Sequence, residues 1–330
     1  MSNWLAIGMG SKNSKGKWME VYFPKALINP PKQITKQIKD LAEYKEGNLS
    51  SPIPEEVLPE LQKMYKGFHD LDRNLGVIAT IDSKDPPHDV PSSYLRLHLL
   101  SHRLVKPNQI NLDGIFSILP TVAWTSAGPI DPADLENTFI EKRLNNQPLH
   151  VHSLDKFPCM TDYVIPEGVR IANSHRVRLG AYLGEGTTVM HEGFVNFNSG
   201  TLGKSMVEGR ISQGVVVEEG SDLGGGSSTM GTLSGGNETL ISLGKDCLLG
   251  ANSGLGIPLG DRCIIEAGLY ITAGTKIELI QSKDEVKEVK ASELAFKDDL
   301  LFVRNSLTGK VQCKTNLKKV SLNDDLHSNN

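Results

Sequence analysis

The chain has 330 residues, of which 38% are hydrophobic and 22% are charged, and its formal net charge is −4. These values are typical of a folded, soluble protein of two or three domains. A weakly acidic chain is a poor candidate for nucleic-acid binding, which needs a concentrated basic surface. No segment approaches the roughly 20 apolar residues of a membrane span, and no secretory signal is recognisable. The four cysteines form no C-x-x-C pair, which argues against a zinc motif and favours a reducing, cytoplasmic compartment.

Residues 1–155 are predicted to form an amino-terminal α/β domain. Apolar residues recur there at three- and four-residue steps, which is the pattern of helices with one packed face. Asp131 and Pro132 are expected to be the cap and the first-turn proline of the last of these helices. The predicted helices lie at 57–71, 94–104 and 135–144, the strands at 76–81 and 115–124, and a loop at 82–91.

The glycines Gly8, Gly10 and Gly16 superficially follow the pattern of a phosphate-binding loop. The Gly-Lys-Ser/Thr ending of that loop is missing, because Lys17 and Trp18 follow Gly16. A turn between two amino-terminal strands is therefore the better interpretation.

Residues 156–280 are predicted to form a triangular, left-handed parallel β-helix. An aliphatic residue recurs every six residues, a period that neither a helix nor a simple strand explains. Each group of six would form one short strand with its aliphatic residue inward, and three groups, about 18 residues, would complete a turn. Glycine after many of these residues permits the corners. The aliphatic positions are Ile165, Ile171, Val177, Leu183, Val189, Val195, Ile211, Val217, Leu223, Leu243, Leu249, Leu255, Leu259, Ile265, Ile271 and Ile277.

The six-residue register breaks around 196–206 and at the turn-rich stretch 234–238. Loops that leave a rigid solenoid often carry function, although a tolerated surface insertion is the plainer interpretation. After Ile277 the repeat ends, and residues 281–330 are predicted to form a small carboxyl-terminal β segment. It is expected to hold a charged surface loop at 283–290 and short strands at 300–303, 310–313 and 319–322.

Several kinds of protein use such a coil, so individual residues must decide its function. Acyl-CoA-dependent acyltransferases, zinc carbonic anhydrases and purely structural proteins are the main classes. A carbonic anhydrase needs three histidines on zinc, whereas the coil contains only His175 and His191. Glu208 and Arg210 alternate with apolar neighbours and are expected on one face of a strand. They could be a surface ion pair, but their place at a register break favours a site.

The most distinctive strings of the sequence lie at 190–198, 206–212, 224–236 and 250–256. They resemble the tetrahydrodipicolinate N-succinyltransferases, most of all the longer, actinobacterial-type branch of that family. The likeness is dense from about 163 to 277, continues through 302–306 and 322–327, and is weaker before 150. The strings are long and unusual, so the resemblance is specific.

The resemblance implies a reaction of lysine and diaminopimelate biosynthesis. Succinyl-CoA would give its acyl group to the nitrogen of 2,3,4,5-tetrahydropyridine-2,6-dicarboxylate, with N-succinyl-2-amino-6-oxopimelate and CoA as products. The resemblance also implies a homotrimer with active sites in grooves between neighbouring β-helices. A related acyltransferase that uses acetyl-CoA or another amine acceptor is the alternative, and a catalytically silent scaffold is the non-enzyme alternative.

The same resemblance implies roles for individual residues. Glu208 matches the catalytic carboxylate, which can act as the base for the acceptor nitrogen or as a nucleophile that forms an acyl anhydride. Gly231 matches the position whose backbone N–H stabilises the thioester oxyanion. Arg210 matches a succinyl-CoA contact, and its planar guanidinium suits carboxylates. The other positions implied to contact CoA are Gly225, Ser228, Ala251, Glu266, Ala267, Gly274, Lys290, Arg304 and Ser306.

The branch resembled also implies a magnesium ion on the trimer axis, held by two acidic positions per subunit. Glu192 matches one of these positions, but His175 stands where the other acid is expected. Magnesium prefers oxygen ligands, so imidazole is a poor substitute. The sequence therefore predicts that this ion is weakly bound or absent. His175 and Glu192 are expected to form a pH-sensitive polar cluster instead.

Overall fold

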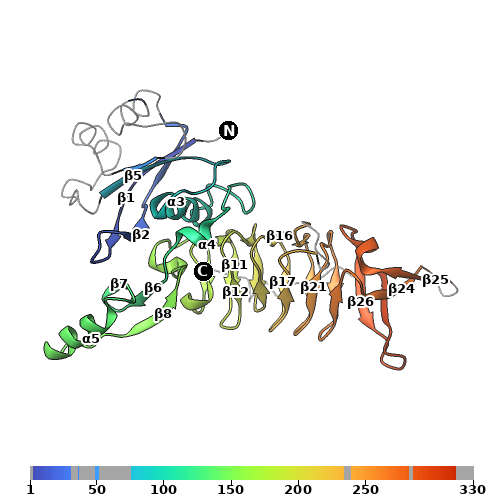
Figure 1. Ribbon diagram of the computed structural model, residues 1–330. Coiled ribbons are helices and arrows are strands. Elements are labelled where there is room, and N and C mark those ends of the chain that lie inside the picture. The colour runs from blue at the N-terminus through green and yellow to red at the C-terminus, as the bar shows by residue number, and fades with distance from the viewer. Residues whose placement is uncertain are drawn as a thin grey trace. The chain divides into compact units, whose positions relative to one another are not determined.

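The computed structural model describes residues 3–30, 36, 49–51, 76–233, 239–281 and 285–316. The helix predicted at 57–71, the strand predicted at 319–322 and the stretch 234–238 lie outside these ranges. The chain divides into two compact units, Met1–Leu99 with Gln109–Pro158 and Leu100–Asn108 with Cys159–Asn330 (Figure 1). The predicted division of the chain after residues 155 and 280 stays a prediction.

The first unit contains an antiparallel sheet with the strand order β2-β1-β5-β4, in which β3 also pairs with β1. β1 and β5 are its centre, and their buried side chains, such as Leu5 and Ile78, form the core. The turn predicted near the amino terminus joins β1 to β2. Gly16 takes a φ of 74° there, while Gly8 and Gly10 lie within β1 itself. The strands are β1 (Asn3–Lys12), β2 (Trp18–Tyr22), β3 (Ala26–Ile28), β4 (Leu49–Ser51) and β5 (Gly76–Asp82).

Helix α3 (Val90–Ser101) confirms the helix expected around 94–104, with its start shifted toward the amino terminus. Asp89 begins it, since its Oδ1 accepts the Ser92 N–H at 2.8 Å. Arg96 is fully buried on this helix and donates to the backbone carbonyls of Ser92, Asn111, Asp82 and Asp85. Burial lowers the pKa of Arg96 to about 10, so the side chain stays charged at neutral pH. Arg96 thereby fixes the loop that precedes the helix.

The strand predicted over 115–124 is wrong in its first half. Residues Ile115–Ile118 form the short helix α4, which follows Gly114 in the left-handed region at φ 79°. Pro120 disfavours helical geometry at Leu119, which is extended at φ −69° and ψ 126°, and so ends α4. Only the second half forms a strand, β6 (Val122–Thr125).

A three-stranded antiparallel sheet in the order β7-β6-β8 completes the first unit. Its other strands are β7 (Gly128–Ile130) and β8 (Val151–Asp155), and helix α5 (Leu135–Leu144) connects them. The helix confirms the prediction at 135–144, but Asp134 is its cap residue, so Asp131 and Pro132 lie before it. Asp131 instead accepts hydrogen bonds from the Asn13 side chain and the Ala133 N–H.

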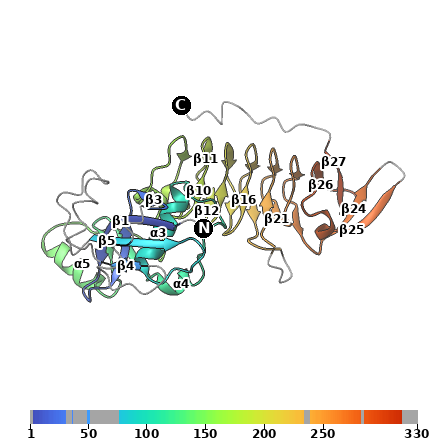
Figure 2. The same ribbon diagram turned by 90° about the horizontal axis from the view of Figure 1, so that it is seen from above.

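The second unit is a coil of short parallel strands that forms a row of stacked turns (Figures 1 and 2). Each strand pairs with the strand one turn further along, which produces three sheets. This confirms a β-helix of hexapeptide repeats. The strands are β9 (Arg170–Ile171), β10 (Tyr182–Leu183), β11 (Thr187–Val189), β12 (Phe194–Val195), β13 (Gly200–Thr201), β14 (Ser205–Val207), β15 (Arg210–Ile211), β16 (Val216–Val217), β17 (Asp222–Leu223), β18 (Ser228–Thr229), β19 (Ser242–Leu243), β20 (Leu248–Leu249), β21 (Gly254–Gly256), β22 (Ile264–Ile265) and β23 (Tyr270–Thr272).

The interior of the coil is the column of aliphatic residues that the repeat predicts. From Val177 to Ile277 these residues are buried, and Ile171 is half-buried. Ile165 is 77% exposed, so its assignment to the column is wrong. Some polar groups of the interior are paired, since the Thr187 and Thr201 hydroxyls lie 2.7 Å apart. The buried hydroxyls of Ser205, Ser227 and Ser253 have no hydrogen-bond partner among the described residues.

The carboxyl-terminal segment closes the coil with four longer strands, β24 (Lys276–Ile280), β25 (Val286–Lys290), β26 (Leu300–Arg304) and β27 (Val311–Thr315). β26 pairs with β22 and so continues one sheet of the coil. The surface loop predicted at 283–290 is wrong where it is described, because β25 pairs with β24 along its length. Short 3₁₀ turns occur at Met160–Asp162, Ser174–Arg176 and Ala291–Leu294. None of the helices described in either unit is long and apolar enough to cross a bilayer.

Candidate functional site

One corner of the coil is shorter than its neighbours. On most turns, four residues connect the β11-β14-β17-β20-β22 sheet to the β12-β15-β18-β21-β23 sheet. These connections are 190–193, 224–227, 250–253 and 266–269. Between β14 and β15 it uses only Glu208 and Gly209. Gly209 permits this, because a Cβ at that position would clash with Ser227 Oγ. The corner is therefore two residues short, and the six-residue register breaks here. The break expected around 196–206 is wrong, because Thr201 keeps the six-residue step inside the coil.

Glu208 occupies the short corner with a free carboxylate. Its N–H donates to Leu223 O at 2.8 Å, and its carbonyl accepts the Gly226 N–H at 3.3 Å. The half-buried side chain makes no hydrogen bond or ion pair with any residue that the structure describes. A Cβ added to Gly225 would lie 3.4 Å from Oε2, so the carboxylate faces the backbone of that glycine. The main chain thus fixes Glu208, while its carboxylate is available to a ligand.

Arg210 is the first residue of the next strand, β15. Its Nε and Nη2 donate to Ser228 Oγ at 3.2 and 2.6 Å, which aligns the guanidinium along the outside of the coil. The prediction that Glu208 and Arg210 share one face of a single strand is wrong. β14 ends at Val207, and the two-residue corner separates the pair.

Gly231 is the second residue after β18, before the chain reaches β19. Its carbonyl accepts the Ile241 N–H at 3.3 Å. Its own N–H has no acceptor among the described residues, which is the state that an oxyanion donor requires in the absence of substrate.

Three of the positions predicted to contact CoA form one column. The strand register places Gly225, Ala251 and Ala267 at equivalent corner positions on successive turns. These small side chains leave the backbone accessible along the corner, as the passage of a pantetheine arm would require. Glu266, next in the chain to Ala267, accepts the Arg304 N–H through Oε2 at 2.7 Å.

The remaining predicted CoA contacts lie at the carboxyl-terminal end of the coil. Gly274 follows β23, and open space surrounds its Cα. Lys290 ends β25 and pairs with Lys276, while Ser306 stands in the turn between β26 and β27. All three are exposed, and no contact brings them to Glu208 within one subunit.

The positions considered for magnesium do not fit that ion. His175 Nδ1 lies 3.5 Å from Cys159 Sγ, and the Glu192 carbonyl accepts Arg176 Nη2 at 2.8 Å. Within the described part of one chain, no three acidic, histidine or cysteine side chains gather as a metal site. Thiol and imidazole are poor partners for a hard cation, so no step is assigned to magnesium. A cluster shared by several subunits stays a prediction.

The sequence analysis missed two arginines that lie beside Phe194, the strand neighbour of Arg210. Phe194 is the strand neighbour of Arg210 on β12, and the Arg176 and Arg178 guanidinium carbons lie 6.0 and 5.8 Å from its ring centroid. The hexapeptide register contained the signal. Arg176, Phe194 and Arg210 each stand immediately before an inward aliphatic residue, so all three point outward on one face. This face is suited to anionic groups.

The fold and the site together are those of an acyltransferase-type β-helix protein. The coil consists of hexapeptide repeats, and the free carboxylate in its short corner faces a line of small residues. Family models agree: a hexapeptide repeat of succinyl-transferase matches residues 240–273, and the middle part of tetrahydrodipicolinate N-succinyltransferase matches residues 119–158.

Whole-chain comparisons are more specific. The chain is 52% identical to the 2,3,4,5-tetrahydropyridine-2,6-dicarboxylate N-succinyltransferase of Pseudomonas paraeruginosa, over 99% of this chain and 98% of that one. It is 49% identical, at the same coverage, to the enzyme of that name from Vibrio cholerae. A solved structure from Campylobacter jejuni, named as a candidate 2,3,4,5-tetrahydropyridine-2-carboxylate N-succinyltransferase, superposes with a TM-score of 0.85 at 32% identity. That match covers 96% of this chain and 93% of the other. The chain belongs to the tetrahydrodipicolinate N-succinyltransferase family.

Proposed function

We propose that this protein transfers succinyl from succinyl-CoA to the nitrogen of 2,3,4,5-tetrahydropyridine-2,6-dicarboxylate, a step of lysine and diaminopimelate biosynthesis. The observation that carries the proposal is identity of about half over nearly the whole chain to enzymes named for this reaction. The short corner with Glu208 supports it independently, because it leaves a carboxylate unpaired beside a line of small residues. The branch within the family stays a prediction.

The acceptor is a cyclic imine, so one water opens it to an amine and the 6-oxo group. The amine nitrogen then attacks the thioester carbonyl, an N–C bond forms, and the C–S bond to CoA breaks. Glu208 takes the proton that the nitrogen loses and passes it to the leaving thiolate. Attack of Glu208 on the thioester, with an acyl anhydride as intermediate, would use the same carboxylate. In both routes the Gly231 N–H would donate to the developing oxyanion.

Arg210 would recognise the carboxylate of the succinyl group. Ser228 holds its guanidinium in place, and a planar fork binds carboxylate in two parallel hydrogen bonds. Gly225, Ala251 and Ala267 would line the CoA groove. The remaining proposed contacts are Ser228, Glu266, Gly274, Lys290, Arg304 and Ser306. An acetyl group lacks the carboxylate, so Arg210 favours succinyl-CoA over acetyl-CoA as donor.

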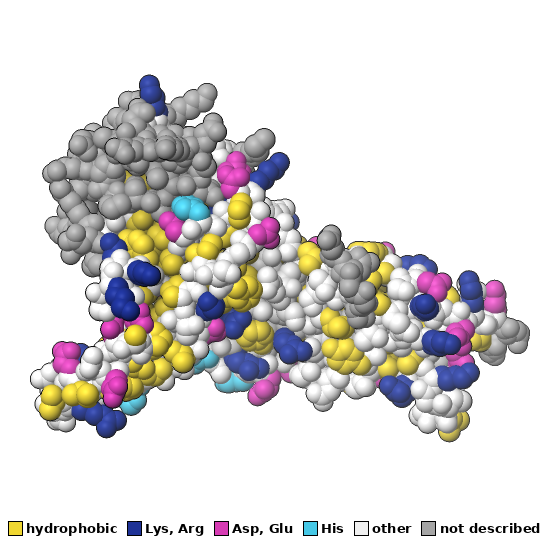
Figure 3. Space-filling view, viewed as in Figure 1, with side chains coloured by type: hydrophobic (Ala, Val, Ile, Leu, Met, Phe, Trp, Pro, Cys, Tyr) yellow, Lys and Arg dark blue, Asp and Glu magenta, His cyan; other side chains and the backbone are white. Residues whose placement is uncertain are grey.

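The working assembly proposed is a homotrimer of left-handed β-helices in the cytoplasm, with each active site between two subunits. Residues 128–155, which we call the α5 arm, provide evidence for a partner subunit. It contains no buried residue, and Ile140, Leu144 and Leu154 are 52%, 82% and 61% exposed. Apolar side chains gather at this end of the first unit (Figure 3). A short helix and small sheet with so little burial gain little stability alone.

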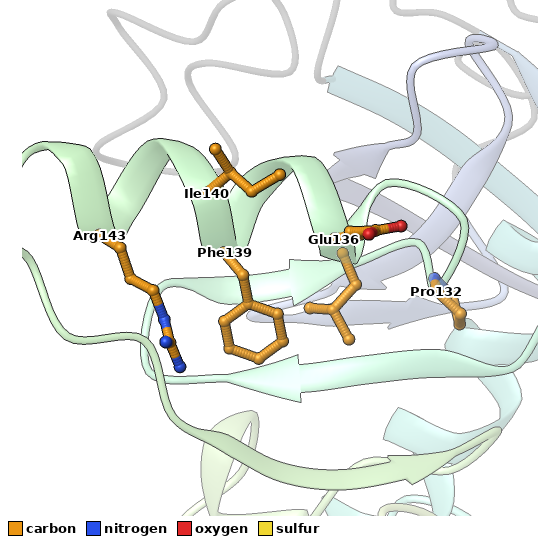
Figure 4. A pocket seen from close by; sticks show the side chains of 6 residues that line it. Pro132, Glu136, Phe139, Ile140 and Arg143 are labelled. Carbon is orange, nitrogen blue, oxygen red and sulfur yellow. The ribbon is translucent and has the colours of Figure 1, made fainter.

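The helix of the arm offers two apolar sides. Phe139, Ile140 and Arg143 all line a hollow of about 500 Å³. The Phe139 and Arg143 side chains leave the helix on one side and the Ile140 side chain on another (Figure 4). A partner that covered both sides would bury this surface. The hexapeptide period and the family support the left-handed coil, and the proposed domain boundaries at 155 and 280 follow the change from mixed to repeated sequence.

Release of the CoA thiol tests the reaction directly. Purified protein is mixed with tetrahydropyridine-dicarboxylate and either succinyl-CoA or acetyl-CoA, and free thiol is followed with a chromogenic disulfide. Release that requires the acceptor and strongly prefers succinyl-CoA supports the proposal. Equal rates with both donors would favour the acetyl-CoA alternative. Absence of thiol release with either donor would refute the proposed activity.

A further inference from the structure

A second candidate site lies wholly within the first unit, in a pocket of about 630 Å³. Its walls are the turn between β1 and β2, the start of α3, the link from α4 to β6, and Asp131 after β7. This volume is within the usual range of small-molecule sites. None of the residues assigned above to acyl transfer lines the pocket, so the proposed function leaves it unexplained.

The wall formed by the β1–β2 turn has a preset shape. Asn13 Oδ1 accepts the N–H groups of Lys15 and Lys17 at 3.0 and 2.9 Å, and Asn13 Nδ2 donates to Asp131 at 2.7 Å. Gly16 supplies the left-handed residue of the turn at φ 74°. The two lysines therefore project from a turn that is fixed before any ligand arrives.

The lining carries both signs of charge on different walls. Lys15 and Lys17, from the turn, form no ion pair with a described residue. Asp131 and Asp89 belong to the other walls, and so does His88. Asp89 is already engaged, because its Oδ2 lies 3.4 Å from His88 Nε2 and its Oδ1 accepts the Ser92 N–H. The Ala133 N–H and the Asn13 side chain hold the pKa of Asp131 below its usual range, so this carboxylate is ionised. The pocket thus offers the two lysine ammonium groups and the Asp131 carboxylate to one ligand.

The pocket is also lined by apolar side chains. Trp18 is half-buried, and Val90, Ile118 and Pro120 complete the apolar lining. We infer that the pocket binds a free α-amino acid with an apolar side chain. Lys15 and Lys17 would bind its carboxylate, Asp131 would bind its ammonium group, and the apolar residues would contact its side chain.

Calorimetric titration of the full-length protein with L-norleucine tests this inference. Hexanoate is norleucine without its ammonium group, and pentylamine is norleucine without its carboxylate. Binding of one norleucine per chain is expected, with each analogue at least about tenfold weaker, because each loses a charge-assisted hydrogen bond. Absence of norleucine binding would overturn the inference, and so would hexanoate or pentylamine binding as tightly as norleucine.

The double variant Lys15→Gln, Lys17→Gln locates the binding. Both side chains are exposed and unpaired among the described residues, so the fold should survive, which circular dichroism checks. Norleucine binding should weaken at least about tenfold, whereas Lys84→Gln, an exposed lysine of the same unit outside the pocket, should leave it unchanged. Unchanged binding in the double variant would place the ligand elsewhere and refute the assignment. None of these readouts depends on succinyl transfer.

Discussion

Replacing Glu208 with glutamine removes the proposed base or nucleophile and keeps the shape of the side chain. The carboxylate has no hydrogen bond or ion pair with a described residue, so the free energy of unfolding should change by no more than about 0.5 kcal/mol. The amide can neither accept the proton of the attacking amine nor form an acyl anhydride. The turnover number should therefore fall at least about 100-fold, which corresponds to about 2.7 kcal/mol of activation free energy.

Thiol release at saturating succinyl-CoA and acceptor measures this loss, and thermal unfolding measures the fold. Glu218→Gln is the matched control, because Glu218 is also half-buried and also follows a strand of the coil, β16. It should retain normal turnover. Turnover in Glu208→Gln within a few-fold of the parent protein would show that the short corner is a structural irregularity without a catalytic role.

Three further predictions concern other parts of the chain. The change Ile140→Asp with Leu144→Asp should shift sedimentation from trimer toward monomer, while Glu141→Gln should not; an unaltered trimer would exclude the α5 arm from the interface. Dialysis against a chelator should leave turnover unchanged. A loss of turnover that only magnesium restores would contradict the conclusion that His175 does not suit a magnesium site. Arg96→Met should lower the free energy of unfolding by about 3 kcal/mol in urea titrations, because several carbonyls lose their donor; a stability equal to the parent's would refute this.

The coil could be predicted from sequence because its signal is local and repeated. One inward position every six residues leaves a periodic trace, and burial follows that trace from Val177 to Ile277. Inward Thr201 and Thr229 escaped the pattern because they are polar, although the Thr201 hydroxyl is paired inside the coil. Ile165 was wrongly included because periodicity alone does not mark where a coil begins.

The first unit and the carboxyl-terminal segment were less predictable because their contacts are not periodic. Residues 115–124 are mostly apolar like a buried strand, yet Gly114 and Pro120 divide them into a helical turn and a short strand. The charged stretch 286–290 forms a strand because β24 supplies a pairing partner, which composition does not reveal.

The site was found by resemblance, and its geometry required the structure. Alternation suggested that Glu208 and Arg210 share a strand, whereas pairing with β11 and β12 shows that the chain turns between them. The proposed grooves between subunits would involve more than one chain, so their geometry does not follow from the sequence or structure of a single subunit.

Lengthening the Glu208 corner tests most directly whether the break in the six-residue register serves catalysis. Inserting Gly-Ser after Gly209 would restore the length found at 190–193 and 224–227, which the coil already accommodates. Thermal stability should therefore be kept. The Glu208 carboxylate, however, would no longer be held against Gly225, and a displacement of about 1 Å can cost about 100-fold in rate. The same insertion after Asn146, in the exposed turn that follows α5, should leave turnover intact. A lengthened corner with full thiol release would show that Glu208 needs no fixed position, and the link drawn between the register break and catalysis would be wrong.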